Sequence, residues 1–271
     1  MESKQSSSHL IAPDYENNEY SLPSEEEHEG LNRLQTRQYL LRFTWKKEYT
    51  APIHEKLKAG AKVIDVACDM GYWLLDMASK YPKSQFTGVD KVSIPHPSDL
   101  SSNANFEMGD AYCLPYEDGS LDFVRFSFSL AIFPAKDWTK SILPEALRIL
   151  KPGGYIELQE FDCDMNNLVI QFLKANKMDT KLCSNMEKYL RETNFVSIDT
   201  IDVECNIWDG TYGKLALEDF ITTYKLMMPY LSKFIGIEKD PYLNLLKKLE
   251  EEVKDYKSSH KLFRFIGRKP S

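Results

Sequence analysis

Two hydrophobic rhythms alternate between residues 62 and 161. Short apolar runs, typical of buried strands, are separated by segments whose apolar residues recur every three or four positions, typical of helices. The strand-like runs are KVIDVA, QFTGVD, NFEMGD, SLDFVRFSFS and KPGGYIELQEF. Helices are predicted over YWLLDMASKY, which ends before Pro82, and over KDWTKSILPEALRIL, where Pro144 predicts a bend or a restart. This alternation predicts an α/β fold, with a parallel sheet covered by helices on both faces.

Helical spacing continues on both flanks of this region. Before it, one long helix or two joined helices are predicted over about 24–58, with Ser24 and Glu27 as a capping box. The elements predicted after it are helices near 166–176, 181–193, 215–235 and over PYLNLLKKLEEEVKDYK, and strands over SIDTIDVECNIW and HKLFRFIGR. Residues 1–20 are rich in Ser, Asn and acids, which predicts a disordered tail. We therefore expect a single domain over 21–271.

Composition narrows the class of protein. The net charge of −7 argues against broad electrostatic capture of nucleic acid or of an anionic membrane. The N-terminus lacks the apolar core of a secretory signal, and no apolar run is long enough to span a membrane. The five cysteines show no CxxC spacing, so we expect reduced thiols and no metal site. The expected location is the cytoplasm, with the nucleus as the alternative.

The carboxyl ends of the early strands carry candidate binding residues. Asp65 and the loop DVACDMG end the first strand, and Asp90, Asp110 and Ser127 end the next three. Ligands of such sheets bind outside the carboxyl ends of the strands. An acid after the second strand can accept hydrogen bonds from both hydroxyls of a ribose, and one after the third can accept from an adenine amine. This register favours a nucleoside ligand over a chance arrangement of surface acids.

The same segments resemble a known family. VIDVACDMGYW, FTGVD, MGDA, LDFV and EALRILKPGGYIELQEFD are similar to the successive motifs of class I S-adenosylmethionine-dependent methyltransferases, with LRILKPGG the most specific piece. The flanks YSLPSEEEHEGLNRL, GKLALEDF and YKSSHKLFRFIGRKP resemble the fungal LaeA-like group, so the resemblance covers about 19–269. It implies a Rossmann-like, seven-stranded, mostly parallel sheet whose last strand is antiparallel. N-terminal and C-terminal helices, including those from 166 to 193 and from 215 to 257, are expected to act as a lid over the site.

The resemblance also implies a cofactor, S-adenosyl-L-methionine, and residues that bind it. By position these are Asp65, Ala67, Asp69, Gly71, Asp90, Asp110, Ala111 and Ser127. Asp90 would hold the ribose, and Asp110 the adenine amine, with the backbone of Ala111 beside it. Ser127 would meet the methionine end. Within the first loop, Asp65 would open the turn and Gly71 would close it against the following helix.

The first loop departs from the family pattern of three alternating glycines. Ala67, Asp69 and Gly71 occupy these positions, and Ala67 adds only a methyl group. Asp69 adds a side chain and a carboxylate near the cofactor's own carboxylate, and such charges repel by about 4 kcal/mol at an effective dielectric constant of 20. Aspartate tolerates a positive φ better than most residues do. Asp69 either caps the following helix or marks a site that has decayed while the fold persisted.

The predicted function is methyl transfer to an oxygen, nitrogen or carbon of an acceptor. Such a transfer mainly requires positioning and exclusion of water, so we name no catalytic acid or base. Gln159 and Glu160 either face the acceptor or belong to the structure after the fifth strand. No Asn/Asp-Pro-Pro-aromatic stretch follows the fourth strand. A small molecule or a protein is therefore favoured over nucleic acid as the acceptor.

Two other functions remain as alternatives. The chain could be a weak or inactive protein with the methyltransferase fold that acts in a regulatory complex with a protein partner. Asp69 supports this alternative, whereas Asp90 and Asp110 oppose it. A nicotinamide-dependent dehydrogenase is disfavoured, because the GDA and LKPGG segments have no place in one.

Overall fold

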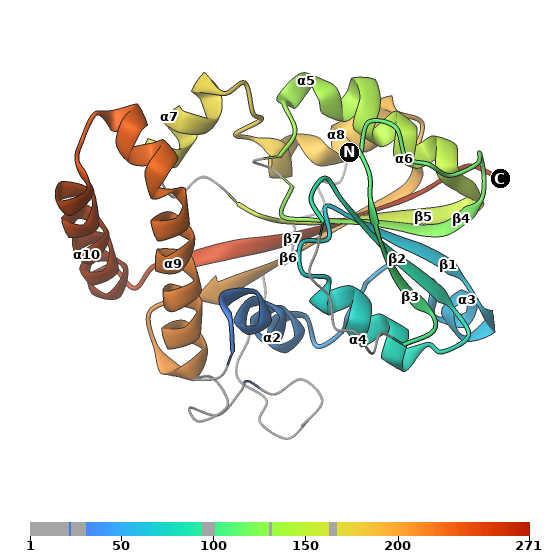
Figure 1. Cartoon of the computed structure of the whole chain (residues 1–271), viewed down its shortest axis with the longest axis horizontal. Coiled ribbons are helices and arrows are strands. Elements are labelled where there is room, and N and C mark those ends of the chain that lie inside the picture. Colours follow the sequence, from blue (N-terminus) through green and yellow to red (C-terminus); the bar gives the residue numbers. More distant parts are fainter. Residues whose placement is uncertain (1–21, 23–30, 94–100, 130–131, 163–166) are drawn as a thin grey trace, which may run out of the picture. The chain divides into compact units, whose positions relative to one another are not determined.

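The computed structural model describes residue 22 and residues 31–93, 101–129, 132–162 and 167–271 (Figure 1). The tail predicted over 1–20 and the capping box predicted at Ser24 and Glu27 lie outside the described residues. Among the described residues, a capping box is present at the start of the helix Arg33–Trp45. There the side chain of Asn32 accepts from the backbone N–H of Gln35, and the side chain of Gln35 accepts from the N–H of Asn32.

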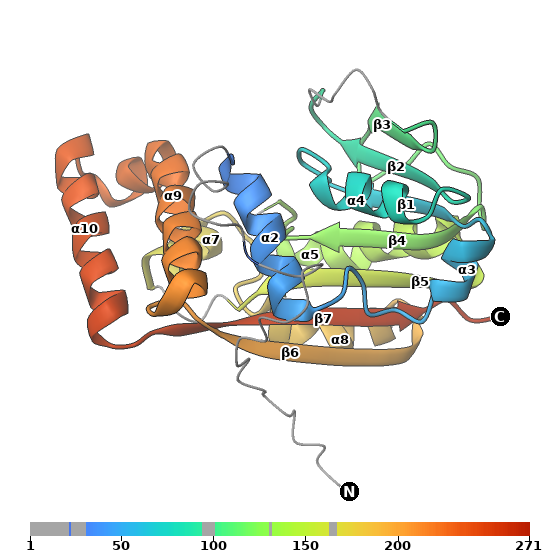
Figure 2. The same ribbon diagram turned by 90° about the horizontal axis from the view of Figure 1, so that it is seen from below.

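The strands form one seven-stranded sheet in the order β3-β2-β1-β4-β5-β7-β6. Their bounds are β1 Lys62–Val66, β2 Gln85–Asp90, β3 Ala104–Met108, β4 Leu121–Ser127, β5 Leu150–Phe161, β6 Val196–Asn206 and β7 Ser259–Arg268. The strands β1 to β5 pair in parallel. The end of β7 lies beside the start of β5, because Gly153 donates to the carbonyl of Lys269 and Lys269 donates to that of Gly154. Figure 2 shows β7 running opposite to β4, which confirms the predicted antiparallel last strand.

The helices follow the predicted periodicity. Their bounds are α2 Arg33–Trp45, α3 His54–Ala59, α4 Tyr72–Lys80, α5 Ala135–Asp137, α6 Leu143–Ile149, α7 Asn167–Ala175, α8 Leu182–Glu192, α9 Gly210–Ile235 and α10 Lys239–Asp255. The region predicted over about 24–58 as one long helix or two joined helices contains two separate helices, α2 and α3, among its described residues. Pro144 lies in the first turn of α6, where no intrahelical N–H is needed, and a π-helical turn over Trp138–Ile142 joins α5 to α6.

The described chain divides into two compact units. One comprises Met1–Lys47, Cys163–Phe172 and Asp202–Leu262, as far as the structure describes them, and the other comprises Glu48–Asp162, Leu173–Ile201 and Phe263–Ser271. The division falls within β6 and β7, so the expected single domain over 21–271 stays a prediction. The lid expected from the N-terminal and C-terminal helices also stays a prediction.

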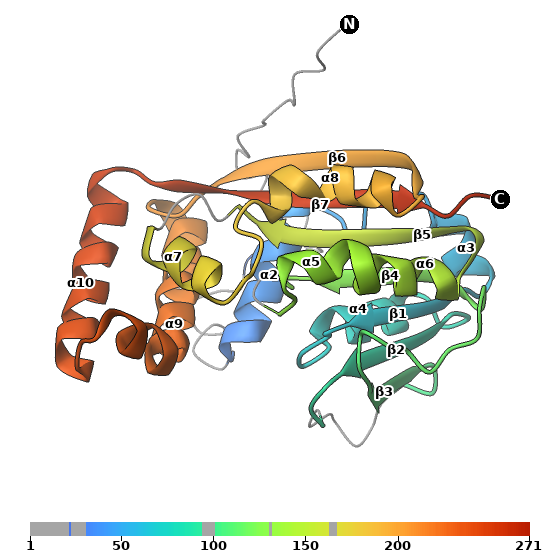
Figure 3. The same cartoon turned by 90° about the horizontal axis from the view of Figure 1, so that it is seen from above.

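The unit that contains β1 to β5 buries both faces of its sheet. On one face, α3 and α4 contribute Leu57, Leu74 and Met77, which are fully buried (Figure 2). On the other face, α5, α6 and α8 cover the strands, and Trp138 and Ile142 are fully buried (Figure 3). Apolar residues on both faces explain why the strands read as near-continuous apolar runs.

The other unit is mainly helical. Its α2 and α9 pack together, as do α9 and α10. Arg33 and Arg37 on α2 both form ion pairs with the buried Asp219 on α9. Among the described residues, no helix is both long enough and apolar enough to cross a membrane.

Candidate functional site

The loop after β1 has a left-handed backbone at each of the three positions singled out in the sequence. The φ angle is 56° at Ala67, 49° at Asp69 and 69° at Gly71. A residue other than glycine holds this conformation at a cost of about 1–2 kcal/mol, and aspartate does so more readily than most. The loop is tied to the end of β2, because Ala67 donates to the carbonyl of Val89 at 2.8 Å and Asp69 donates to Oδ2 of Asp90 at 3.2 Å. The chain thus keeps the glycine-type loop shape without two of its glycines.

Gly71 allows this loop to pack closely against β3. A Cβ atom at Gly71 would lie 2.3 Å from the ring of Phe106, and one at Gly88 would lie 2.7 Å from both the same ring and Sγ of Cys68. Gly71 is also the N-cap of α4. Asp69 is exposed and lies two residues before this position, and capping of α4 by its carboxylate stays a prediction.

Asp65 lies beneath the loop in a buried ion pair. Its side chain is 3% exposed, and Oδ1 accepts from Nη1 of Arg125 at 2.9 Å. The guanidinium group of Arg125 stacks over the ring of Trp73 at 4.2 Å. Burial raises the pKa of Asp65, and the charge of Arg125 opposes this rise. In this structure Asp65 links β1 to β4, and its predicted role in cofactor binding stays a prediction.

A pocket opens at the carboxyl ends of β1, β2 and β3. It is lined by Val66, Ala67, Val89, Asp90, Lys91, Gly109, Ala111, Ile132 and Phe133. Three of the predicted site residues, Ala67, Asp90 and Ala111, line it. The lining is mostly apolar or small, and Asp90 is its one acid.

Asp90 and Asp110 lie near Lys91, a residue that the sequence pattern did not single out, and Asp110 forms an ion pair with it. Oδ1 of Asp90 accepts from the N–H of Val92 at 3.3 Å, and each carboxylate oxygen of Asp90 can accept a further hydrogen bond. The side chain of Asp110 is 49% exposed and lies 3.5 Å from Nζ of Lys91. Oδ1 of Asp110 also accepts from the N–H of Tyr112. Asp110 is therefore near the pocket but engaged with Lys91.

Ser127 ends β4 and is bonded to β5. Its Oγ accepts from Nε2 of Gln159 at 3.2 Å, and Oε1 of Gln159 accepts from Nε of Arg264 at 2.9 Å. Burial lowers the pKa of Arg264 to about 10, and the charge of Glu157 opposes this change. Gln159 is 1% exposed.

Glu160 is also buried, at 3% exposure, and accepts from the N–H and the hydroxyl of Ser129. The side chains of Gln159 and Glu160 thus bond to the protein itself. Their burial favours the structural interpretation over a direct contact with an acceptor.

An aromatic cluster supports the pocket from the segment after β4. The ring of Phe133 lies 5.4 Å from that of Trp138 at right angles, and 5.9 Å from that of Tyr112. The hydroxyl of Tyr112 donates to Asp137, and burial raises the pKa of Tyr112 to about 12. Sequence reasoning missed Ile132 and Phe133, since their segment carried no signal beyond its apolar character.

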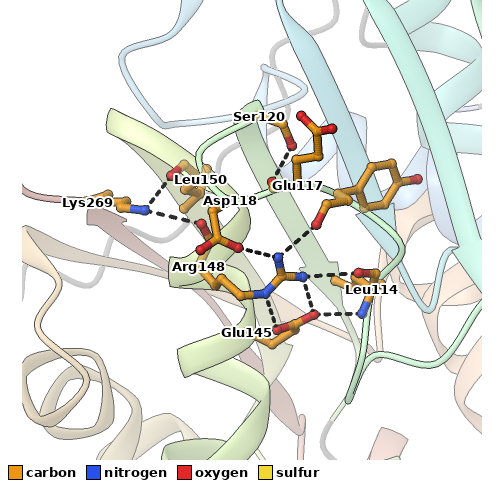
Figure 4. Close-up of polar contacts among 9 residues, drawn as sticks. Leu114, Glu117, Asp118, Ser120, Glu145, Arg148, Leu150 and Lys269 are labelled. Atoms are coloured by element: carbon orange, nitrogen blue, oxygen red, sulfur yellow. Dashed lines mark hydrogen bonds and ion pairs between the residues drawn. The ribbon is translucent and has the colours of Figure 1, made fainter.

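The motif EALRILKPGG forms a clamp on the loop that follows Ala111 (Figure 4). Arg148 donates to Glu145, to Asp118 and to the carbonyls of Leu114 and Tyr116, over 2.7–3.1 Å. Glu145 in turn accepts from the N–H of Leu114 at 2.7 Å. Hydrogen bonding to Arg148 lowers the pKa of Glu145. The motif therefore fixes the loop that carries one wall of the pocket.

The chemistry of the pocket lining suits a nucleoside. Apolar side chains suit a base, and a carboxylate at the end of β2 suits the two hydroxyls of a ribose. Gly109 lets the ends of β2 and β3 approach, because a Cβ atom there would lie 2.7 Å from Cγ1 of Val89.

Residues 63–154 match the family model described as "Methyltransferase domain". This match identifies residues 63–154 as a methyltransferase domain. The matched region runs from β1 into β5 and includes the loop, the acids and the clamp described above. The seven-stranded order with an antiparallel β7 agrees with this assignment.

Several known proteins are similar to this chain, and their names describe different activities. "Secondary metabolism regulator laeA" of Coprinopsis cinerea is 29% identical over 148 residues, which are 53% of this chain and 36% of that protein. A Haemonchus contortus phosphoethanolamine N-methyltransferase 2 superposes with a TM-score of 0.52 at 15% identity, covering 89% of this chain and 60% of that one. The [4+2]-cyclase SpnF superposes with a TM-score of 0.54 at 18% identity, covering 92% and 97%. These structural likenesses show the fold.

The chain spans less than half the length of the first curated relatives it matches, at 36%, 47% and 43%. Activity and acceptor are therefore proposals for this chain.

Proposed function

We propose that this chain binds S-adenosylmethionine in the pocket at the carboxyl ends of β1, β2 and β3, and transfers its methyl group to a small molecule or a protein. The observation that carries the proposal is Asp90, the one acid in a lining whose other residues, apart from Lys91, are apolar or small. The similar Haemonchus contortus enzyme is described as a complex with S-adenosylhomocysteine, which supports a ligand of this class.

The residues of this chain act by binding and positioning. Asp90 accepts from the ribose hydroxyls, the apolar wall of Val66, Val89 and Phe133 holds the base, and Ala111 offers its backbone beside the base. When bound, the cofactor supplies a methyl group on a cationic sulfur, so transfer is an in-line displacement. The protein then has to align the acceptor and exclude water, and it needs no acid or base of its own for that.

Asp69 weakens this site without removing it. Its side chain is exposed and lies outside the pocket lining, so solvent reduces the repulsion of a ligand carboxylate. Binding weaker than that of a glycine-rich relative is the expected result.

The acceptor is proposed to be a small molecule or a protein, because the net charge of −7 disfavours nucleic acid. The cytoplasm is the proposed location, with the nucleus as the alternative.

A second function is favoured by the loop itself: a weak or inactive methyltransferase-fold protein that acts in a regulatory complex. Asp69 stands where the family has glycine, and one similar protein is named a regulator of secondary metabolism. Another protein of similar fold is named a cyclase, so this fold alone does not determine methyl transfer.

Calorimetric titration with S-adenosylmethionine, S-adenosylhomocysteine and NADH tests the proposal. Heat of binding with the first two ligands and none with NADH is expected. No heat and no thermal shift at millimolar ligand would refute the proposal. Binding without transfer of a labelled methyl group to any component of an extract of the source cells would favour the second function.

A further inference from the structure

Three polar side chains form a relay from the buried side of the sheet to its carboxyl edge. Nε of Arg264 on β7 donates to Oε1 of Gln159 on β5, and Nε2 of Gln159 donates to Oγ of Ser127 on β4. Arg264 is 3% exposed and Gln159 is 1% exposed, whereas Ser127 is only partly buried. The relay therefore ends at a group that a ligand can reach.

The relay has a fixed direction. A guanidinium group can only donate, so the atom of Gln159 that faces Arg264 is its oxygen, and its amide nitrogen faces Ser127. The amide nitrogen also only donates, so Oγ of Ser127 accepts and its hydrogen points elsewhere. Among the residues that the structure describes, the hydroxyl of Ser127 has no other hydrogen-bond partner.

Arg264 is itself held in place, which keeps the relay rigid. It donates to Oγ1 of Thr50 at 3.2 Å and to the carbonyl of Glu48 at 3.3 Å. Its Nε also lies 3.6 Å from Oε1 of Glu157. The amide of Gln159 is thus oriented by a side chain that cannot readily move.

Ser127 lies next to the nucleoside pocket. Val66 pairs with Phe126 across β1 and β4, which places Ser127 beside Ala67 in the pocket lining. On its other side, Ser127 pairs with Gln159 across β4 and β5. The hydroxyl hydrogen of Ser127, which the relay leaves available to donate, therefore lies at the carboxyl edge of the sheet, one strand from the pocket.

We propose that Gln159 and Arg264 are positioning residues that make Ser127 a hydrogen-bond donor to the carboxylate of the cofactor's amino-acid end. The inference rests on the proposed function and assigns a selective task to two buried side chains. They act through Ser127 and make no contact with the ligand themselves.

The test compares two ligands that share a nucleoside and a thioether. S-adenosylhomocysteine carries the amino-acid group, and 5′-methylthioadenosine lacks it. Gln159→Glu keeps the size of the side chain and its contact with Arg264. Because a carboxylate only accepts hydrogen bonds, the hydroxyl of Ser127 must donate to it. That hydroxyl can then no longer donate to the ligand. A loss of roughly tenfold or more in S-adenosylhomocysteine affinity is expected, with 5′-methylthioadenosine affinity unchanged within about twofold.

A double-mutant cycle separates positioning from general stability. Ser127→Ala should show the same selectivity between the two ligands as Gln159→Glu, and the double variant should bind no more weakly than Ser127→Ala. Equal losses for both ligands, or an additive loss in the double variant, would overturn the inference. If circular dichroism shows that Gln159→Glu is unfolded, Gln159→Met replaces it with the same criterion of a loss confined to S-adenosylhomocysteine.

The outcome also separates this inference from the proposed function. If the parent binds both ligands and the cycle is additive, only the relay fails. If the parent binds neither ligand, the proposed function fails and the relay fails with it.

Discussion

Asp69 combines backbone strain and charge in one exposed residue of the first loop. Asp69→Gly should raise the free energy of unfolding by about 1 kcal/mol, because glycine adopts a φ of 49° without cost. It should also tighten S-adenosylmethionine binding by about fivefold, the effect of removing about 1 kcal/mol of solvated repulsion. Denaturant unfolding and calorimetry measure the two effects separately.

Asp69→Asn is the matched control. It removes the charge but keeps a side chain that tolerates the same backbone, so it should share the gain in affinity and not the gain in stability. Added salt should narrow the affinity gap between the parent and the Asn variant. Adenosine, which has no carboxylate, should respond to neither substitution. Unchanged affinity for the cofactor in both variants would mean that the loop has adapted to Asp69.

The site residues that lie at the ends of strands could be predicted from the sequence. Asp90 follows from the rule that ligands bind outside the carboxyl ends of parallel strands, whereas Ala67 and Ala111 were implied by the family resemblance, and all three line the pocket. Lys91 was visible next to Asp90 but carried no pattern of its own. Phe133 could not be predicted, because the path of a loop decides which side chains it turns inward.

At the scale of elements, Gly71 lets the start of α4 pack against Phe106 of the sheet, where there is no room for a larger side chain. Gly71→Ala would combine a φ of 69° with a Cβ atom 2.3 Å from the ring of Phe106. Gly236, after α9, has a similar φ of 72° but no atom within 4 Å of an added Cβ. Gly236→Ala should therefore cost about 1 kcal/mol, and Gly71→Ala about 1–3 kcal/mol more.

Denaturant unfolding of these two variants separates two contributions to the loss of stability. Gly236→Ala measures the backbone strain alone, and Gly71→Ala adds the steric clash with Phe106. Equal losses of stability would show that Phe106 moves aside freely and that α4 is not fixed by this contact. A larger loss at Gly71 would show that the loop depends on close packing against β3.

Elements were predictable from periodicity, and their junctions were not. The strand β2 was predicted with its observed bounds, because QFTGVD is an isolated apolar run between polar segments. Pro144 was predicted to bend or restart the helix, and α6 does begin with Pro144 in its first turn, where a proline needs no hydrogen-bond donor. The capping box at Asn32 and Gln35 was missed because the Ser24 and Glu27 pattern fits the same motif earlier in the chain.

At the scale of the whole molecule, the pH dependence of stability should depend on His260. Burial lowers the pKa of His260 to about 4 from an ordinary value of 6.5, and the charge of Arg37 makes a smaller contribution in the same direction. Between these two pH values, His260 is therefore protonated in the unfolded chain and neutral in the native chain. The resulting stability is fully present above pH 6.5 and is lost as pH falls through about 4, and it amounts to about 3 kcal/mol.

Urea unfolding at pH 7, 5.5 and 4.5 measures this dependence. His260→Gln should show a shallower loss of stability on acidification than the parent does. His54→Gln, at an exposed histidine, serves as the control and should keep the slope of the parent. Identical slopes in all three proteins would show that other groups govern the acid response.

The whole sheet was predictable, whereas the grouping of its helices was not. Alternating runs and the family resemblance together predicted seven strands with an antiparallel last strand, and the structure has both features. The two compact units have no signal in the sequence, because their division falls inside β6 and β7 and not in a linker. Long-range packing of this kind is set by contacts that local periodicity does not encode.

Calorimetric titration of S-adenosylhomocysteine into the parent and into Asp90→Asn tests most directly whether the pocket holds a ribose through Asp90. The Asn variant keeps an oxygen for the N–H of Asp69 at Oδ2, so its melting temperature should stay close to that of the parent. Its affinity should fall by about 10- to 100-fold, because charge-assisted hydrogen bonds are worth about 1.5–3 kcal/mol each. Equal affinity in the two proteins would contradict a ribose site at Asp90.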